Sequence, residues 1–295
     1  MSTVASEAKP LPSRSQAPLY RPRKRWTRFL LPTFTWLMIL YLTLPVLVMI
    51  LYSFNAIPVQ PVRQTAKFWG FTLEWWRDPL GVAGLPEALK NSLSIAPISA
   101  AIATVIGTLL GLALGRYRFR GLAAVSFIIF IAIAVPEIVL GSSLLSLYVE
   151  WPSLPILGPL APAIGWTTIL LSHISFSIAF VAITVRARVQ GLDRSLEDAA
   201  QDLFANPVVA FFKVTLPLIA PAILAGFLLA FVLSLDDFVI TNFTSGSTFT
   251  FPTYVFGASR IGIPPQVNVW GTILFSAGII AAVASVLSGR RRGKA

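Results

Sequence analysis

Six long blocks of apolar residues dominate the pattern of hydrophobic and polar positions along the chain. The blocks run over roughly 29–54, 91–114, 122–149, 163–185, 217–240 and 268–288. Each block is a continuous apolar run rather than a one-sided stripe, and each is long enough to cross about 30 Å of hydrocarbon. We therefore expect an all-α integral membrane protein whose six transmembrane helices occupy residues 29–288, with tails at 1–28 and 289–295.

The composition supports a membrane protein. The chain has 295 residues, of which 56% are hydrophobic and only 12% are charged, and its mean hydropathy is +0.77. A soluble domain of this length carries about twice that charged fraction. The chain contains no cysteine, which excludes disulfides, thiolate metal sites and cysteine nucleophiles.

The basic residues are unevenly distributed, and their distribution predicts the orientation. Of the 23 Lys and Arg residues, 18 lie in the two tails and in the loops 115–121 and 186–216, and five lie in the other loops. An excess of basic residues beside apolar spans marks the cytoplasmic side. We therefore expect both termini in the cytoplasm, with 1–28 as a disordered basic tail. The net charge of +11 follows from this topology and does not indicate nucleic-acid binding.

The cytoplasmic connection 195–206 has the pattern of a short amphipathic helix. Apolar residues recur at helical spacing, at Leu196, Ala199, Ala200 and Leu203. Ser195 and Asp198 have the spacing of a capping box at the start of the helix, and Asn206-Pro207 ends it.

The opposite face of this predicted helix is polar. It carries Glu197, Asp198, Gln201 and Asp202. Acidic side chains disfavour attachment to a membrane surface, because interfacial helices are usually basic on their polar face. We therefore expect a protein partner to dock on this helix, and the alternative is that the helix folds back on its own bundle.

This part of the sequence resembles the EAA loop of bacterial ABC importer permeases. The resemblance is carried by residues 197–203, Phe211, 214–217 and 221–223. It implies that 195–206 is a coupling helix that docks on an ATP-hydrolysing subunit. The docking residues implied are Glu197, Asp198, Ala199, Ala200, Asp202, Leu203 and Phe204. The family usually has glycine where this chain has Phe204.

The nucleotide site is expected on another chain. No G-x-x-x-x-G-K-[ST] phosphate loop occurs in the sequence. If transport is driven by ATP, then ATP and Mg²⁺ bind a partner ATPase, and we expect no cofactor on this chain.

Three acidic residues fall inside predicted spans. They are Glu137, Asp236 and Asp237, and no Lys or Arg lies deep in a span to neutralise them. Placing a carboxylate at the centre of a membrane span costs about 2.5–3.5 kcal/mol on insertion scales. We therefore expect each of these carboxylates to face a cavity and to have a function. The third span enters from the cytoplasm near Leu122, so we expect Glu137 about 22 Å along it, in the outer half of the membrane. Glu137 follows Pro136, where we expect the helix to be broken.

These carboxylates predict a pathway for a cationic solute, because a negatively lined cavity attracts cations and repels anions. Adjacent aspartates point about 100° apart on a helix, so we expect one of Asp236 and Asp237 to face the pathway and the other to cap a helix or bond a neighbour. An interfacial pair in contact with water is the alternative. His173, alone among hydroxyl residues, is predicted to be a hydrogen-bonded packing residue rather than a metal ligand.

Further segments resemble the polyamine-type (spermidine/putrescine) branch of these permeases. They are 91–93, 135–141, 234–241, 260–264 and Asn268. The resemblance covers about residues 30–290 and implies a type I (MetI-like) permease fold in the bacterial inner membrane. It also implies four kinds of partner: membrane lipid, a second permease subunit that makes a heterodimer, two ATPase subunits and a periplasmic substrate-binding protein.

Other functions remain open at this point. The same architecture serves other solutes, such as an opine, a phosphonate or ferric iron. A secondary transporter that uses the carboxylates as proton sites needs no ATPase. A membrane enzyme is disfavoured, because no nucleophile–base pair or metal cluster is visible in the sequence.

Overall fold

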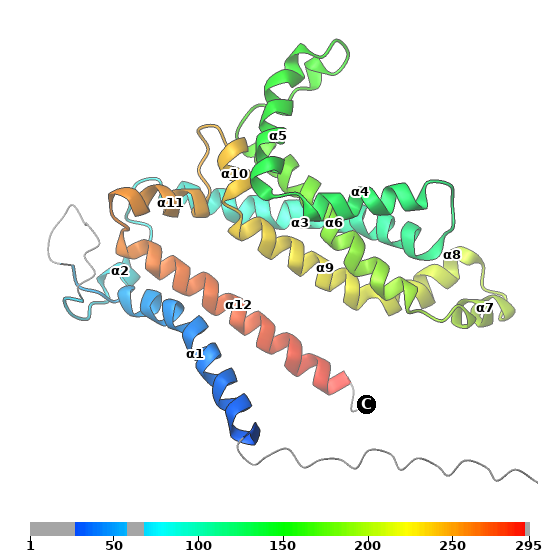
Figure 1. Cartoon of the computed structure of the whole chain (residues 1–295), viewed down its shortest axis with the longest axis horizontal. Helices are drawn as coiled ribbons and strands as arrows, with labels where there is room; N and C mark the ends of the chain where they lie inside the picture. The colour runs from blue at the N-terminus through cyan, green and yellow to red at the C-terminus, as the bar shows by residue number, and fades with distance from the viewer. Residues whose placement is uncertain (1–26, 58–67, 293–295) are drawn as a thin grey trace, which may run out of the picture. The chain divides into compact units, whose positions relative to one another are not determined.

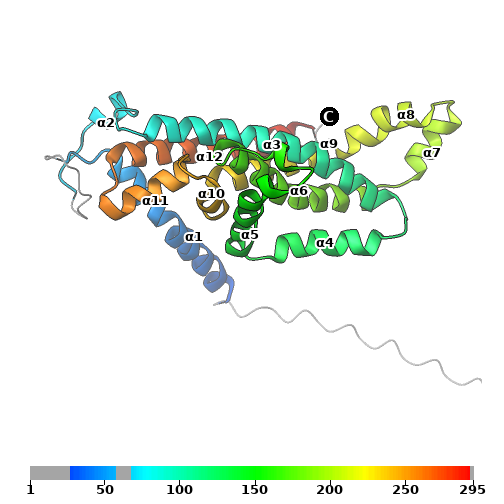
Figure 2. The same ribbon diagram turned by 90° about the horizontal axis from the view of Figure 1, so that it is seen from above.

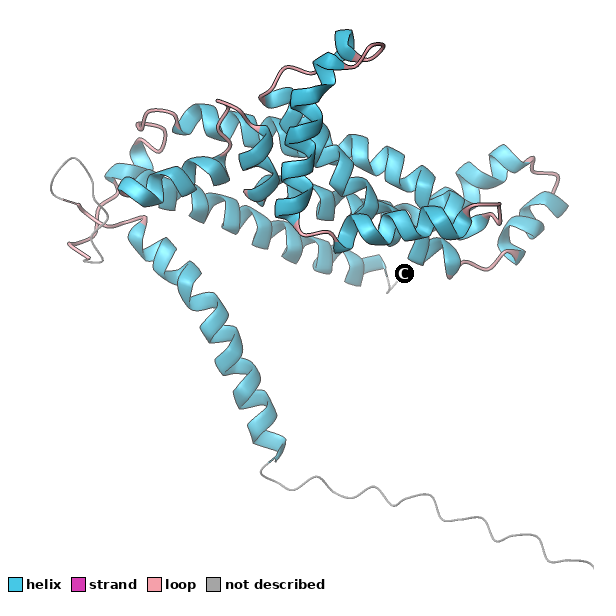
Figure 3. Ribbon diagram, turned by 45° about the horizontal axis from the view of Figure 1, so that its top comes forward, coloured by secondary structure: helices cyan, strands magenta, loops and turns pink. Residues whose placement is uncertain are grey.

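A computed structural model describes residues 27–57 and 68–292. Most of the predicted N-terminal tail therefore lies outside the described residues, and its last two residues belong to the first helix. The predicted C-terminal tail is helical as far as Arg292. Among the described residues the only β-type contact is an isolated bridge between Asn55 and Phe71, and everything else is helix or loop (Figure 3).

The helices follow one another in the order shown in Figure 1. They are α1 (Thr27–Tyr52), α2 (Glu74–Arg77), α3 (Leu85–Arg116), α4 (Leu122–Ala134), α5 (Glu137–Glu150), η1 (Trp151–Ser153), η2 (Gly158–Leu160), α6 (Trp166–Gln190), α7 (Ser195–Asp202), α8 (Pro207–Ala210), η3 (Phe211–Thr215), α9 (Leu216–Asp236), α10 (Val239–Thr244), α11 (Phe251–Ile261) and α12 (Pro265–Arg292). Of these, η1 and η2 are 3₁₀ turns and η3 is a π-helical turn.

The chain divides into two units, residues 1–49 and 50–295. The described part of the first unit is most of α1. Its large apolar side chains are exposed on all sides of the helix, including Trp36 and Leu42. A single helix that is apolar all round is suited to a hydrocarbon environment.

In the second unit, α3, α6 and α9 pack side by side and enclose the main core (Figures 1 and 2). The core side chains include Val181, Val185 and Val189 of α6 and Ile219 and Ala230 of α9, all of them buried. The three helices therefore form one packed layer on which the shorter elements are placed.

Three glycines of α3 allow its close contact with α6. Gly107, Gly111 and Gly115 recur every four residues and lie on one face of the helix. A Cβ at Gly107 would lie 2.7 Å from the Cβ of Val181, and one at Gly111 would lie 2.7 Å from the carbonyl oxygen of Ala182. Small residues at this spacing let two membrane helices approach with their backbones almost in contact.

Four helices are long and apolar enough to cross a membrane, and a fifth span is present if the bent pair α4 and α5 is one span. The four are Phe29–Tyr52, Leu85–Arg116, Trp166–Gln190 and Pro207–Asp236. The sixth predicted span, 268–288, lies within α12, where some side chains are outside the described residues. An all-helical membrane protein is therefore confirmed, and the number six stays a prediction.

The third predicted span is not a straight helix. It breaks after Ala134, and the axes of α4 and α5 differ by 106°. Val135 has ψ 130°, outside the helical range, because the ring of the following proline disfavours helical geometry in the residue before it. The expectation of a broken helix at Pro136 is confirmed, and the depth of Glu137 in the membrane stays a prediction. Glu137 begins α5, which leads away from the long helices (Figure 1).

The two ends of the second unit differ. The short helices α7 and α8 lie at one end, whereas α2 and α11 lie at the other (Figures 1 and 2). The fifth predicted span also ends earlier than expected, because α9 stops at Asp236 and a separate helix, α10, follows. The α7 end carries the predicted docking residues, whereas the start of α5 and the connection from α9 to α10, which carry the predicted pathway carboxylates, lie between the two ends (Figures 1 and 2).

Candidate functional site

The start of α7 differs from the predicted capping box. Arg194 precedes the helix, and no side chain caps it from the N-cap position. The carboxylate of Asp193 instead accepts a hydrogen bond of 2.9 Å from the backbone N–H of Ser195. This backbone bond lowers the pKa of Asp193 below its usual value. The prediction failed because an Asp two residues before the helix competes with serine for the first free N–H groups.

The apolar side chains of α7 are exposed. No residue of the helix is buried, and the exposed fraction is 82% for Leu203 and 99% for Phe204 just beyond its end. Leu196 is also exposed, and Ala200 is half-buried. The alternative that this helix folds its apolar stripe onto its own bundle is therefore wrong. The helix presents an exposed apolar surface at the end of the bundle.

The backbone conformation at Phe204 is one that favours glycine, the residue that the resemblance leads us to expect at this position. Its φ of +64° lies in the left-handed region, which costs an L-residue about 1–2 kcal/mol. The backbone N–H of Phe204 donates to Gln201 O at 2.8 Å, and that of Ala205 donates to Ala200 O at 3.0 Å. These two bonds are the Schellman motif, which terminates a helix and favours glycine at the residue with positive φ. This chain keeps the motif with an exposed aromatic ring.

Glu197 differs from the other polar residues of α7 because it points to its own bundle. One carboxylate oxygen pairs with the guanidinium of Arg116 at the end of α3, and the other accepts the hydroxyl of Thr215 at the end of η3. A cavity of about 360 Å³ lies beside this pair, between α3, α7 and η3. The sequence analysis did not predict that Glu197 pairs with Arg116 and Thr215, because neither lies within a helical turn of it along the chain.

The three predicted pathway carboxylates, at the start of α5 and the end of α9, have different surroundings. Glu137, in the first turn of α5, and Asp236, the last residue of α9, are exposed. Asp237 is buried, with an exposed fraction of 8%. The two adjacent aspartates therefore differ in exposure: Asp236 is exposed and Asp237 is buried.

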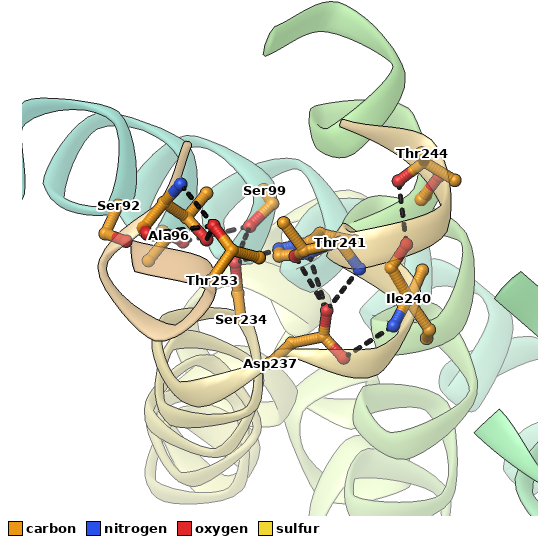
Figure 4. A network of polar contacts seen from close by, with 12 residues as sticks. Ser92, Ala96, Ser99, Ser234, Asp237, Ile240, Thr241, Thr244 and Thr253 are labelled. Carbon is orange, nitrogen blue, oxygen red and sulfur yellow. Dashed lines mark hydrogen bonds and ion pairs between the residues drawn. The ribbon is translucent and has the colours of Figure 1, made fainter. Parts of the chain in front are cut away.

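Asp237 holds the start of α10 (Figure 4). Its Oδ2 accepts the backbone N–H and the hydroxyl of Thr241, each at 2.7 Å, and its Oδ1 accepts the N–H of Ile240 at 3.4 Å. The expectation that one aspartate caps a helix and bonds a neighbour is confirmed for Asp237. The signal available in the sequence was an acidic residue just before a short helix.

His173 joins the same network from α6. Its Nε2 lies 2.9 Å from Thr241 Oγ1 and 3.3 Å from Asp237 Oδ2, and its Nδ1 lies 2.6 Å from Ser234 Oγ. Ser99 of α3 donates to Ser234 at 2.9 Å. The prediction of a hydrogen-bonded packing histidine is confirmed, and four helices meet in this network. Within 27–57 and 68–292 no three His, Cys, Asp or Glu residues form a group that could hold a metal ion.

Comparison with known protein families shows to which family the chain belongs. Residues 107–290 match the family described as binding-protein-dependent transport system inner membrane component. The chain belongs to this family of transport permeases. Members of the family are subunits for transport rather than enzymes, and the ATPase is a separate chain.

Characterised permeases are similar to this one over most of their length. The putrescine transport system permease protein PotI of Escherichia coli K12 is 39% identical over 260 residues, which cover 85% of this chain and 87% of PotI. The spermidine/putrescine transport system permease protein PotC of the same strain is 36% identical over 255 residues, which cover 86% and 91% of the two chains. PotC of Haemophilus influenzae is 34% identical and matches over 97% of its length.

Solved structures support the fold of the permease. A bacterial ABC transporter that imports the acidic polysaccharide alginate aligns with a TM-score of 0.64 at 16% identity, covering 92% of this chain and 99% of that one. The methionine ABC transporter MetNI aligns with a TM-score of 0.55 at 18% identity, covering 70% and 93%. The MetI-like permease fold implied by the sequence is therefore confirmed.

Proposed function

We propose that this permease is one membrane subunit of an ATP-driven importer that moves a small cationic solute, of the putrescine or spermidine class, into the cytoplasm. Transport driven by ATP is supported by the exposure of the apolar side chains of α7 at one end of the bundle. The polyamine class is supported by the identity of 34–39% to permeases named for putrescine and spermidine.

In this proposal α7 is the coupling helix. Ala199, Ala200, Leu203 and Phe204 enter a groove on the ATPase, and Asp198 and Asp202 lie on the polar border of the contact. ATP binding closes the two ATPase subunits and draws α7 toward the corresponding helix of a second permease. That movement converts the cavity between the permeases from inward-facing to outward-facing.

The solute then passes exposed carboxylates at the start of α5 and at the end of α9. Glu137 and Asp236 carry the attraction for cations, because their side chains are exposed and no fixed cation is built beside them within the described residues. Of the two adjacent aspartates, Asp236 faces the pathway, and Asp237 supports it from the buried network.

The assembly and topology complete the proposal. The chain spans the bacterial inner membrane six times, with both termini in the cytoplasm. It pairs with a different permease subunit, two ATPase subunits that bind ATP and Mg²⁺, and a periplasmic binding protein. Coupling helix 195–206 lies on the cytoplasmic side of the permease domain 29–288.

Ala200→Glu tests the proposal directly. A carboxylate in the half-buried middle of the docking stripe adds a charge where apolar contact is expected. The ATPase should co-purify with the wild type and be lost from the variant. Ile156→Glu, at an exposed position in the loop between η1 and η2, is the matched control and should retain the ATPase. Retention by Ala200→Glu with normal uptake would refute the coupling role.

A further inference from the structure

Glu197 lies on the proposed docking helix, but its carboxylate is occupied within this chain. Its two oxygens are taken by Arg116 of α3 and by Thr215 at the end of η3. The side chains of the ion pair are 20% and 19% exposed. This carboxylate is therefore turned toward the bundle, whereas Leu203 and Phe204 project outward from the same helix.

Both partners of Glu197 are fixed to the packed layer of the bundle. Arg116 follows Gly115, where a Cβ would lie 2.8 Å from the side chain of Val189 on α6. Thr215 is buried and directly precedes Leu216, which packs against the core of α3, α6 and α9. Glu197 is thus attached to α3 and, through Thr215, to the start of α9 beside their packed core.

The connection to α9 passes through an unusual turn. Residues Phe211–Thr215 form a π-helical turn between α8 and α9. Such turns are rare and occur frequently at functional sites, because the wider ring changes the direction of the residues that follow. Here the turn ends on the hydroxyl that bonds Glu197. Within the described residues, Glu197 is the α7 side chain that bonds to another helix.

Two further hydrogen bonds at this end involve α3, α6 and α9. Arg194, just before α7, donates to the carbonyl oxygen of Arg116 at 3.1 Å. Arg188 of α6 donates to the carbonyl oxygen of Leu218 on α9 at 3.0 Å. Arginine side chains that bond to backbone carbonyls therefore hold the segment before α7 to α3, and α6 to α9. The α7 helix itself bonds to α3 and η3 through the side chain of Glu197.

We propose that Glu197, with Arg116 and Thr215, is a positioning residue that transmits the movement of α7 to α3 and α9, and that it is not a contact to the ATPase. The inference rests on the proposed docking of α7. It predicts that breaking this clamp leaves the ATPase bound but lowers the amount of solute moved for each ATP hydrolysed.

The experiment uses the complete complex with its ATPase, second permease and binding protein in proteoliposomes. Arg116→Glu and Glu197→Arg each place like charges together, and the double variant restores an ion pair of reversed polarity. The expected result is unchanged ATPase binding in all three. Putrescine transported per ATP hydrolysed should fall about tenfold in each single variant and return to within about twofold of wild type in the double variant.

A second pair of variants tests the clamp without changing charge. Thr215→Val removes the hydroxyl with little change of shape, and Thr215→Ser keeps it. Thr215→Val should lower the transport per ATP, whereas Thr215→Ser should not. This pair decides the question if the charge variants fail to assemble.

Two results would overturn the inference. One is loss of ATPase binding in Glu197→Arg that the double variant does not restore, which would make Glu197 an interface residue. The other is an unchanged ratio of transport to hydrolysis in Thr215→Val and in the charge variants. Neither result bears on the proposed docking of α7, which is refuted separately if Ala200→Glu retains the ATPase and normal uptake.

Discussion

His173 Nε2 lies 3.3 Å from Asp237 Oδ2, and both side chains are buried where α6, α9 and α10 meet. The same carboxylate holds the first turn of α10 through Thr241. This relationship gives Asp237 a role in the architecture and leaves Asp236, one residue earlier, on the exposed side. Two residues that are identical in type and adjacent in sequence therefore have different surroundings.

The first prediction concerns the stability of this network. Asp237→Ala removes one partner of a buried pair and frees the N–H groups of α10, so it should lower the free energy of unfolding by roughly 3 kcal/mol. Asp236→Ala removes an exposed side chain and should change stability little. Thermal unfolding of the two purified variants in detergent checks this difference. Equal stability of the two variants would contradict the assignment.

The second prediction concerns transport. Glu137→Gln and Asp236→Asn should each lower putrescine uptake about tenfold or more, because a carboxylate a few Å from a cation is worth on the order of 1–4 kcal/mol in a partly shielded site. Assembly with the ATPase should not change, since both residues lie away from α7 (Figure 1). Uptake of labelled putrescine by the intact complex is the measurement. Wild-type uptake in the double variant would exclude a carboxylate-lined pathway.

The third prediction concerns the exposed ring at the end of α7. Phe204→Gly should stabilise the permease by about 1 kcal/mol, because glycine adopts the positive φ without strain. It should also weaken ATPase binding, because the ring is lost. Phe204→Ala is the matched control, since it removes the ring and keeps an L-residue at positive φ. Titration of the ATPase onto each variant measures the second effect, and unchanged affinity in both would show that the ring does not dock.

The fourth prediction concerns the contact between α3 and α6. Gly111→Ala places a methyl group 2.7 Å from the carbonyl oxygen of Ala182, so the helices must separate and the free energy of unfolding should fall by about 1–3 kcal/mol. Gly257→Ala, in α11, meets nothing within 4 Å and should be neutral or slightly stabilising. Unfolding midpoints in detergent compare the two. A neutral Gly111→Ala would mean that the helices are not in close contact.

Run length and spacing were enough to predict much of this fold. Apolar runs such as 91–114 and 163–185 located the long helices, because hydrocarbon requires about 20 apolar residues per span. The helix after Ser195 was predicted from its spacing, but its predicted end before Pro207 was wrong, because α7 stops at Asp202 and the turn at Phe204 terminates it. These features depend on residues close together in sequence.

The features that were missed depend on distant residues or on angles. Pro136 indicated a break, but no local rule gives the direction in which α5 leaves. The pairing of Glu197 with Arg116 joins residues 81 positions apart, and that of Asp237 with His173 joins residues 64 apart. The glycines at 107, 111 and 115 were visible at regular spacing, but their partner helix was not. Such contacts follow from packing, which the sequence pattern alone does not specify.

The central claim is that α7 contacts the ATPase, and a cysteine cross-link tests it most directly. The chain has no cysteine, so Leu203→Cys would introduce its single thiol at an exposed position of the proposed contact. A photoreactive probe on that thiol should cross-link to the ATPase subunit in the assembled complex, whereas the same probe on Ile156→Cys should not. Cross-linking of Ile156→Cys to the ATPase, with none from Leu203→Cys, would contradict the account.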